Sequence, residues 1–249
     1  MGPTSDGAAR RVLVVVGSVT FIEALMLSAL APLLPRYANE LDFGAGAAGV
    51  LTGCFALGLI IGALAAGATA SRRGGKPVVI FGTVTMLASS VLFGVAASVL
   101  VLDAARMIQG VGGGMVWAGG LTWIAASTPP ERRDTATGTA IGVGVTGALF
   151  GPPLGALAVV TSTEFVFSLL VPLALLVALA LLVRTPATPP VPLEGRLLDL
   201  FRRPFRGRAL SAVWVLVVPA ISFGLLNVLG PLRLEAAGAA VGVLTIVWV

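Results

Sequence analysis

Two opposite charges lie inside long apolar stretches and have the clearest potential for chemistry. Glu23 lies near the middle of the apolar run from Val12 to Leu34, and Arg106 lies within the run from Val99 to Ala126. An ionisable group in a bilayer is costly, so it is expected to face a cavity or a partner. Burial disfavours a charged carboxylate and a nearby cation favours it, so a carboxyl group subject to both effects can load and release a proton.

The composition excludes most soluble functions. The chain has 249 residues, of which 57% are hydrophobic and only 11% are charged, whereas a soluble domain carries about 25% charged residues. It contains no His, which removes His-based metal sites and Ser–His or Cys–His nucleophiles. Its single cysteine, Cys54, allows no internal disulfide. We therefore expect a membrane protein that is not an enzyme and that has no metal site and no cofactor.

Apolar stretches of about 20 residues are long enough to cross a bilayer as helices. They predict an all-α, polytopic transmembrane helix bundle with spans at residues 12–34, 45–70, 77–97, 99–126, 135–160, 165–183, 209–230 and 237–249. The predicted domains are a transmembrane half at 1–183, a cytoplasmic central loop at 184–208 and the incomplete start of a second half at 209–249. The last run covers roughly 20 Å, too little to cross the core, so we expect that the chain is truncated in its eighth span.

The loop charges predict the orientation of these spans. The loops on the other side hold only Arg36 and Arg233 as basic residues. The N-terminus and the loops after the second, fourth and sixth spans lie on one side, and they carry Arg10, Arg11, Arg72, Arg73, Lys76, Arg132, Arg133, Arg184, Arg196, Arg202, Arg203, Arg206 and Arg208. Basic loops stay on the cytoplasmic side, so a multi-pass protein with a cytoplasmic N-terminus is expected. This split also explains the net charge of +5 without a nucleic-acid partner. The preference for Arg over Lys, with much Ala and Gly, favours a bacterial plasma membrane.

A short basic loop follows the second predicted span. Gly67, Ser71, Arg72, Gly74 and Lys76 lie in it at a spacing that resembles the signature loop of the major facilitator superfamily. The chain departs from that pattern at Ser71, where the family has Asp, and at the position after Gly74, where Gly75 replaces a basic residue. The resemblance implies a gating loop that latches two halves on the cytoplasmic side, weakened here by the missing acid. A plain tight loop is the alternative.

The fourth predicted span contains Arg106, Gln109, Gly110 and Gly112, which resemble the Arg-x-x-Gln-Gly-x-Gly motif of the same family. Helical spacing places Arg106, Gly110, Gly113 and Trp117 on one face. Arg106 is therefore expected to face the interior. The alternative is that its long side chain reaches the membrane surface.

The fifth predicted span carries a glycine pattern typical of the drug/proton antiporters of that family. Its members are Gly138, Gly147, Gly151, Pro152 and Gly155, with Ala156 in place of a final glycine. The three later glycines recur every four residues and form a strip without side chains, and Pro152 is expected to bend the helix. The resemblance implies that this span seals against span eight and limits leak. Ordinary packing of small residues is the alternative.

The first span resembles that of multidrug and vesicular-amine antiporters, in which an acid lies near the middle, as Glu23 does here. Glu23 lies about 16 Å from the inner side of the membrane core, and Arg106 lies about 20 Å from the same side. The two residues are therefore expected at a similar depth. In this superfamily the two spans are equivalent members of two inverted three-helix repeats. An exchangeable pairing of Glu23 with Arg106, direct or through water, is therefore possible, although a purely structural carboxyl is the alternative.

These features predict a transporter that works by alternating access, with proton-coupled efflux of amphipathic drugs or metabolites as the best subclass. Glu23, Arg106 and Gln109 are the candidate coupling residues, and Trp117 and Asn227 are candidates for the cavity wall. The expected partners are a small-molecule substrate, protons and membrane lipid, and the complete protein is expected to be a monomer. Two alternatives stay open: an uptake carrier for a polar metabolite or sugar, and a truncated fragment that does not transport.

Overall fold

The structure is a computed structural model that describes residues 3–42, 44–189 and 222. Six segments within these ranges are long and apolar enough to cross a membrane, which confirms the predicted helical membrane bundle. Predicted spans seven and eight, most of the central loop and Asn227 lie outside the described residues. The described ranges contain no strand. Helices are the expected solution, because a backbone in lipid must satisfy its hydrogen bonds internally.

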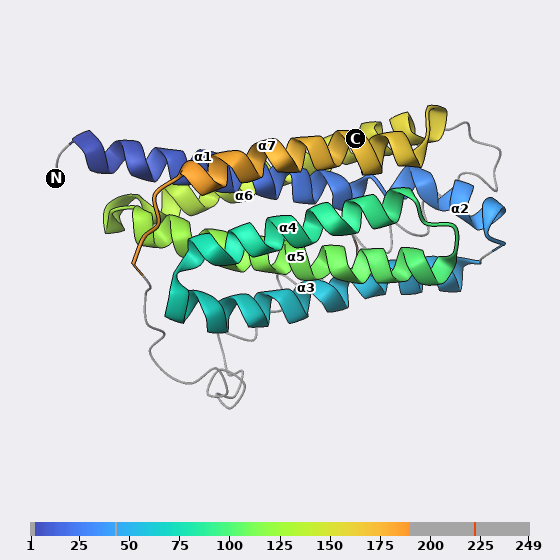
Figure 1. Cartoon of the computed structure of the whole chain (residues 1–249), viewed down its shortest axis with the longest axis horizontal. Coiled ribbons are helices and arrows are strands. Elements are labelled where there is room, and N and C mark those ends of the chain that lie inside the picture. The colour runs from blue at the N-terminus through green and yellow to red at the C-terminus, as the bar shows by residue number, and fades with distance from the viewer. Residues whose placement is uncertain (1–2, 43, 190–221, 223–249) are drawn as a thin grey trace.

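The helices run nearly parallel to one another in an elongated bundle (Figure 1). The N-terminal segment is longer than the sequence predicts, because its helix starts in the polar N-terminus and two short helical elements prolong it as far as Glu40. The element bounds are α1 Pro3–Ser28, η1 Ala31–Leu33, α2 Leu34–Glu40, α3 Ala45–Arg73, α4 Gly75–Gly94, α5 Val99–Ser127, η2 Pro130–Arg132, α6 Arg133–Val160, η3 Glu164–Leu170 and α7 Val171–Arg184.

Local sequence signals set the helix ends. Gly74 ends α3 with a positive φ of 82°, a conformation that glycine adopts without strain. Ser98 caps α5, since its side-chain oxygen accepts a hydrogen bond from the backbone N–H of Val101 at 3.4 Å. Helix α6 continues through Pro152 and Pro153 without interruption.

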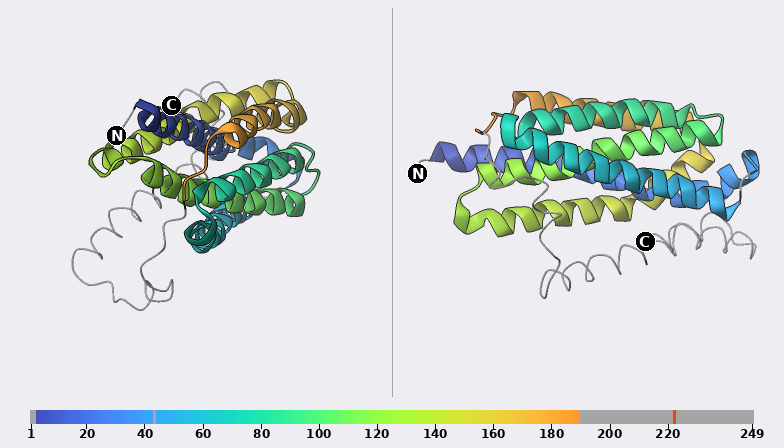
Figure 2. Two further views of the ribbon diagram at one scale, coloured as in Figure 1. Left: turned by 60° about the vertical axis from the view of Figure 1, so that its left-hand side comes forward. Right: turned by 90° about the horizontal axis from the view of Figure 1, so that it is seen from below.

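The helix contacts have the symmetry expected of two inverted three-helix repeats. Helix α5 packs mainly on α3 and α4, and α1 packs mainly on α6 and also on α7. In the two repeats, α1 corresponds to α5, α3 to α6 and α4 to α7. When each helix is replaced by its counterpart, the contacts of α5 with α3 and α4 become those of α1 with α6 and α7. Helices α1 and α5 also touch each other, as do α4 and α7. The bundle therefore consists of two groups, α3–α4–α5 and α1–α6–α7, which meet where α1 contacts α5 and where α4 contacts α7 (Figure 2).

Glycines allow the helix backbones to approach closely within each group. Where α3 crosses α5, a Cβ on any of four glycines would collide with a backbone carbonyl of the opposite helix; these are Gly58, Gly62, Gly110 and Gly114. Such approaches are typical of membrane helix pairs, which gain stability from packing rather than from the hydrophobic effect. The two faces are therefore reciprocal, since each helix supplies glycines to the other.

The glycine strip of α6 faces α1. A Cβ on Gly147 would collide with the carbonyl oxygen of Phe21, and Gly151 and Gly155 make similarly close contacts with the next turns of α1 and with the residue after it. These three glycines therefore pack on α1, and the expectation that this span seals against span eight stays a prediction. Gly138 is exposed, and a Cβ added to it would meet nothing within 4 Å among the described residues. Any contact between α6 and span eight lies outside the described residues.

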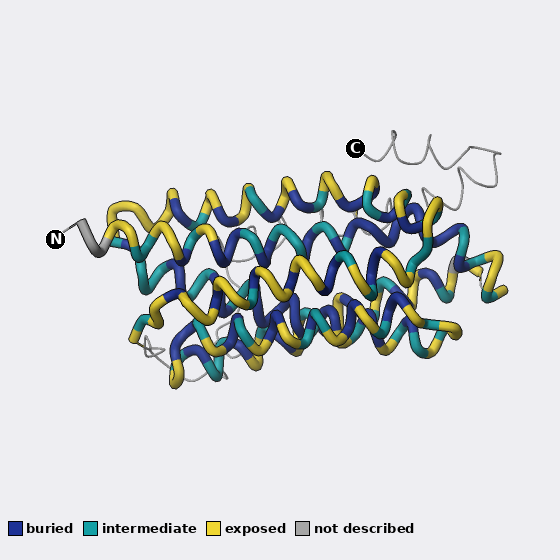
Figure 3. Tube along the Cα trace, turned by 45° about the horizontal axis from the view of Figure 1, so that its top comes forward, coloured by how far each residue is buried: buried dark blue, intermediate teal, exposed yellow. Residues whose placement is uncertain are grey.

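The two ends of the bundle differ in charge. The N-terminus, the α3–α4 turn, the α5–α6 connection and the C-terminus of α7 share one end (Figure 1). We call it the basic end, and it carries Arg10, Arg11, Arg72, Arg73, Lys76, Arg132, Arg133 and Arg184. The opposite end carries Arg36 with Glu40, Asp42, Asp103 and Glu164. Between the two ends, exposed and buried positions alternate along the helices (Figure 3). Many of the exposed residues are large and apolar, as contact with lipid requires.

The close α1–α6 contact predicts the effect of one added methyl group. Gly147→Ala should lower the free energy of unfolding by about 1–3 kcal/mol, because the helices must separate to admit the new Cβ. Thermal unfolding of the purified protein in detergent, followed by circular dichroism, measures the change. Gly138→Ala is the matched control and should be neutral or slightly stabilising, since its Cβ has open space and alanine favours a helix. Equal unfolding temperatures for the two variants would contradict the packing of the strip on α1.

Candidate functional site

Glu23 lies near the C-terminal end of α1, in the middle of the apolar segment Asp6–Glu40, and its side chain is buried, with 2% of the residue exposed. Its Oε2 accepts a hydrogen bond of 2.7 Å from the indole Nε1 of Trp117 on α5. Its Oε1 has no hydrogen-bond partner among the described residues. The carboxyl group packs directly on Gly113, where a Cβ would lie 2.9 Å from Oε1. The absence of a side chain at Gly113 thus makes room for the carboxyl group at the α1–α5 interface.

Trp117 connects the carboxyl group to a third helix. The far edge of its ring packs on Gly144 of α6, where a Cβ would lie 2.6 Å from the ring carbon Cη2. Glu23, Trp117 and Gly144 therefore join α1, α5 and α6 at one level of the bundle. The helical spacing predicted that Trp117 shares a face with Arg106, but it did not predict the hydrogen bond to Glu23.

Arg106 is also buried, with 1% of the residue exposed. Its Nη1 donates a hydrogen bond of 2.8 Å to Oε1 of Gln109. The guanidinium group lies over the ring of Phe55 on α3, with Cζ 4.7 Å from the ring centre, which is a cation–π geometry. Its Nε and Nη2 have no hydrogen-bond partner within the described part of the chain. The side chain therefore points into the bundle, and the alternative that it reaches the membrane surface is wrong.

A direct ion pair between Glu23 and Arg106 is not formed, so that part of the expected pairing is corrected. The ion pairs among the described residues are Arg36 with Glu40 and Arg132 with Asp6. Glu23 sits at the level of Gly113, seven positions from Arg106 on α5, or about 10 Å along the axis. Their opposite charges still interact at this distance. Gln109 occupies the intervening turn, and its Nε2 is buried without a described partner.

The predicted gating loop forms the tight turn between α3 and α4. Lys76 reaches the end of α7, where its Nζ donates hydrogen bonds of 2.9 Å to the carbonyl of Val183 and 2.6 Å to that of Thr185. Ser71 donates to the carbonyl of Ala68 within its own helix. Arg72 is exposed, and Gly67 is half-buried within α3. The contact of this loop with a second half of the protein lies outside the described residues.

Gly75, which replaces a basic residue of the family pattern, has a packing role. A Cβ at this position would lie 2.5 Å from the carbonyl oxygen of Gly119 and 2.6 Å from Cβ of Trp123. The start of α4 is therefore held against α5. A larger residue would force the two helices apart, which gives a local reason for this departure from the pattern.

The sequence profile of the Major Facilitator Superfamily matches residues 16–249. The chain belongs to this superfamily. Multidrug resistance protein 1 of Bacillus subtilis (strain 168) is 29% identical over 159 residues, which cover 64% of this chain and 41% of that protein. Quinolone resistance protein NorA of Staphylococcus aureus (strain Mu50 / ATCC 700699) is 28% identical over 135 residues, which cover 54% of this chain and 35% of NorA. The chain thus spans less than half of either relative.

Solved structures of the superfamily share the fold. An inward-facing, unoccupied bacterial homologue of the human lysosomal transporter Spinster superposes with a TM-score of 0.77 and 18% identity, covering 99% of this chain and 59% of that one. A D-xylose-proton symporter superposes with a TM-score of 0.69 and 14% identity, covering 95% of this chain and 64% of that one. At these identities the likeness concerns the fold alone.

The contact of Lys76 with α7 predicts a local effect on that helix. Lys76→Met should leave the carbonyls of Val183 and Thr185 without their charged donor, at a cost of about 1–2 kcal/mol. Amide hydrogen exchange in the last turn of α7 should then be roughly 5- to 30-fold faster. Arg72→Met, in the same turn, is the control and should leave this exchange unchanged. Unchanged exchange in both variants would refute the capping role of Lys76.

The hydrogen bond between Trp117 and Glu23 predicts a spectroscopic signal. The fluorescence of Trp117, isolated as the difference between the wild type and Trp117→Phe, should change in Glu23→Leu, because leucine cannot accept a hydrogen bond. It should be nearly retained in Glu23→Gln, because the amide oxygen still accepts the indole N–H. If the leucine and glutamine variants give the same Trp117 spectrum, the indole does not bond to this side chain.

Proposed function

We propose that the chain belongs to a membrane transporter that moves small molecules by alternating access, and specifically to a proton-coupled exporter of amphipathic compounds. Membership of the Major Facilitator Superfamily supports the transport class. Two relatives, a multidrug resistance protein and a quinolone resistance protein, support the efflux subclass. The whole protein's activity is a proposal because the chain spans under half of each relative.

The buried carboxyl group of Glu23 carries this proposal. One of its oxygens is fixed by Trp117 and the other has no described donor. An indole N–H can only donate, so the bond to Oε2 is compatible with both the charged and the protonated carboxyl group. Oε1 is then the atom that takes up a proton or faces a cationic cargo, and the Trp117 bond holds the group in place in both states.

Arg106 couples the protonation state of Glu23 to the electrostatic energy of the bundle. With Glu23 ionised, the two opposite charges partly compensate each other in an interior that contains few other polar groups. Protonation of Glu23 removes that compensation and leaves a buried guanidinium, which low dielectric disfavours. Gln109 accepts a hydrogen bond from Arg106 and lies one turn further toward the level of Glu23, and its amide N–H₂ has no described partner and is free to donate to a shifted carboxyl group.

This change of charge acts on three helices. Glu23 belongs to α1, Arg106 to α5, and the ring of Phe55 under the guanidinium belongs to α3. A proton can shift an alternating-access equilibrium only if it binds one state more tightly than the other. A site shared by three helices meets this requirement whenever the helices move relative to one another. With the basic end in the cytoplasm, an inward proton gradient would drive efflux.

The surroundings of the site favour this subclass over uptake of a sugar or polar metabolite. The buried polar side chains of α1 and α5 are few, namely Glu23, Arg106 and Gln109 with the hydroxyls of Thr20 and Ser28, whereas a sugar needs many hydrogen-bonding groups. The efflux relatives likewise favour transport over a fragment without transport. We further propose a bacterial plasma-membrane location with a cytoplasmic N-terminus and a monomeric complete protein.

A transport assay tests the role of Glu23. Proteoliposomes that contain the full-length protein are given an imposed pH gradient, and the efflux of a fluorescent lipophilic cation such as ethidium is recorded. Glu23→Gln should lower the gradient-driven rate at least about tenfold, because the amide cannot bind and release a proton. Glu23→Asp should retain part of it.

Glu164→Gln is the matched control, since Glu164 is an exposed carboxylate at the opposite end of the bundle, and its transport rate should equal that of the wild type. Wild-type coupling in Glu23→Gln would show that Glu23 is not the coupling carboxyl group. Absence of gradient-driven transport in the wild type, across cationic, neutral and anionic probes, would count against proton-coupled export itself.

A further inference from the structure

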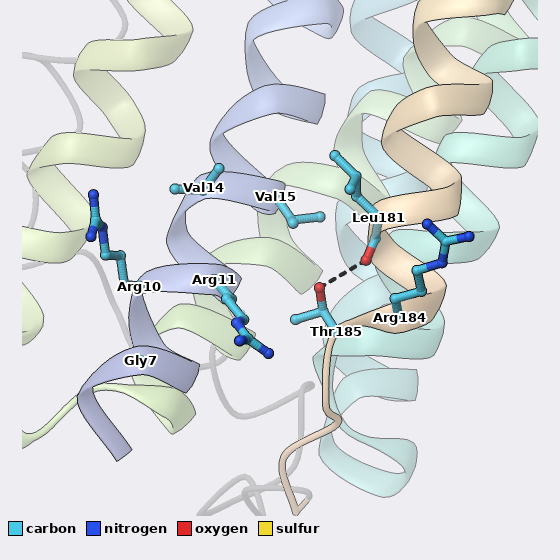
Figure 4. A pocket seen from close by; sticks show the side chains of 8 residues that line it. All are labelled: Gly7, Arg10, Arg11, Val14, Val15, Leu181, Arg184 and Thr185. Atoms are coloured by element: carbon cyan, nitrogen blue, oxygen red, sulfur yellow. Dashed lines mark hydrogen bonds between the residues drawn. The ribbon is translucent and has the colours of Figure 1, made fainter. Parts of the chain in front are cut away.

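A groove at the basic end, between α1 and α7, combines three arginines with an apolar wall. Its volume is about 570 Å³, and it is lined by Gly7, Arg10, Arg11, Val14, Val15, Leu181, Arg184 and Thr185. Figure 4 shows Arg11 between the two helices beside Thr185, with Arg10 on α1 and Arg184 on α7 pointing outward on either side of it. The sequence analysis used these arginines only to orient the chain, and the coupling site does not involve them.

The arginines of the groove form no salt bridge with any described acid. No ion pair within the described residues includes Arg10, Arg11 or Arg184. Asp6 is the nearest acid along α1, and it pairs instead with Arg132 at 3.4 Å. Among the described residues the cluster therefore has an unbalanced positive charge, which calls for an anionic group.

The end of α7 does not need Arg184 either. The carbonyls of Val183 and Thr185 accept hydrogen bonds from Lys76, and the hydroxyl of Thr185 donates to the carbonyl of Leu181 at 2.8 Å. These bonds supply donors to several carbonyls at the end of the helix, where an arginine would otherwise serve as a cap. They also place the positive charge of Lys76 next to the groove.

The other wall of the groove is apolar and open to the outside. Val14 is 56% exposed and Leu181 is 43% exposed, and both lie toward the middle of the bundle from the arginines. Along the bundle axis the groove therefore passes from cations at the end to bare hydrocarbon nearer the centre. A soluble anion would match the first part only, whereas a phospholipid matches both.

We propose that this groove binds the headgroup of an anionic phospholipid, with the phosphate at Arg11 beside Thr185, Arg10 and Arg184 flanking it on the two rims, and the start of an acyl chain along Val14 and Leu181. Basic pockets between transmembrane helices at the cytoplasmic side suit such headgroups. With the proposed cytoplasmic position of the basic end, the groove lies in the inner leaflet. This site is independent of the proposed transport cycle, since none of its residues touches Glu23 or Arg106.

Lipid titration of the purified full chain tests the assignment. Native mass spectrometry in a neutral detergent counts palmitoyl-oleoyl-phosphatidylglycerol molecules retained per chain, with palmitoyl-oleoyl-phosphatidylcholine as the neutral lipid. Arg11→Gln/Arg184→Gln should weaken retention of the tightest phosphatidylglycerol about tenfold and leave phosphatidylcholine unchanged. Arg72→Gln/Arg73→Gln, which removes two exposed arginines from the same end, is the matched control and should change retention less than about twofold.

A second variant addresses the apolar wall without changing charge. Leu181→Trp places a large side chain in the groove at an exposed position, where folding should be unaffected, and it should also weaken phosphatidylglycerol retention. Equal losses in the two arginine pairs would overturn the proposal in favour of general surface charge. If millimolar inorganic phosphate displaces phosphatidylglycerol and Leu181→Trp has no effect on its retention, the groove binds a soluble anion and the lipid proposal is overturned. A gain of lipid binding in Glu194→Gln/Asp199→Asn would identify acids of the central loop as the occupant.

Discussion

The cost of enclosing charge in an interior without water constrains this bundle more than any other interaction. Glu23 and Arg106 are both almost completely buried, and within the described chain neither is neutralised by direct contact with an opposite charge. Each is instead held by weaker groups, an indole N–H for the carboxylate and an amide oxygen with an aromatic face for the guanidinium. Several of their polar atoms have no partner among the described residues. Such a cluster is poorly suited to maximal stability and well suited to exchange a proton or a ligand.

Close backbone contact is the counterpart of this polar cluster. The α3–α5 and α1–α6 crossings consist of glycines against carbonyl oxygens, which leaves little freedom for those pairs to slide. Glu23 on α1 and Gly113 on α5 belong to different pairs, and the contact between those two helices is less extensive. The charged residues therefore lie at the boundary between two tightly packed units, where a small relative displacement changes their environment most.

The sequence was sufficient for the architecture and for the identity of the unusual residues. Runs of about 20 apolar residues predict the six spans that the structure describes, and the helical spacing of Arg106, Gly113 and Trp117 correctly places them on one inward face. The vertical register was less accessible, because an error of a few residues at a span end moves a side chain by several ångströms. Because of that error, the sequence predicts Glu23 and Arg106 at the same depth. In the structure Glu23 lies beside Gly113, two turns of α5 away from Arg106.

Rotation about the helix axis was also beyond the reach of the sequence. The strip of Gly147, Gly151 and Gly155 was recognisable, but the partner that fills it depends on which neighbour α6 turns toward. Phe55 and Gly144 were missed at the site for the same reason, since their roles depend on contacts between helices distant in the sequence. The only local signal for Phe55 was its place one turn before Gly58, on the face of α3 that meets α5.

The capping of α7 by Lys76 has a mechanical consequence. Lys76, at the start of α4, donates hydrogen bonds to the end of α7. These bonds connect the first repeat directly to the last helix of the second repeat. Thr185 is then a fixed departure point for the polypeptide that follows. A displacement of that polypeptide would therefore act through Lys76 on the α3–α4 turn, so the position of this turn would respond to movement of the segment that follows Thr185.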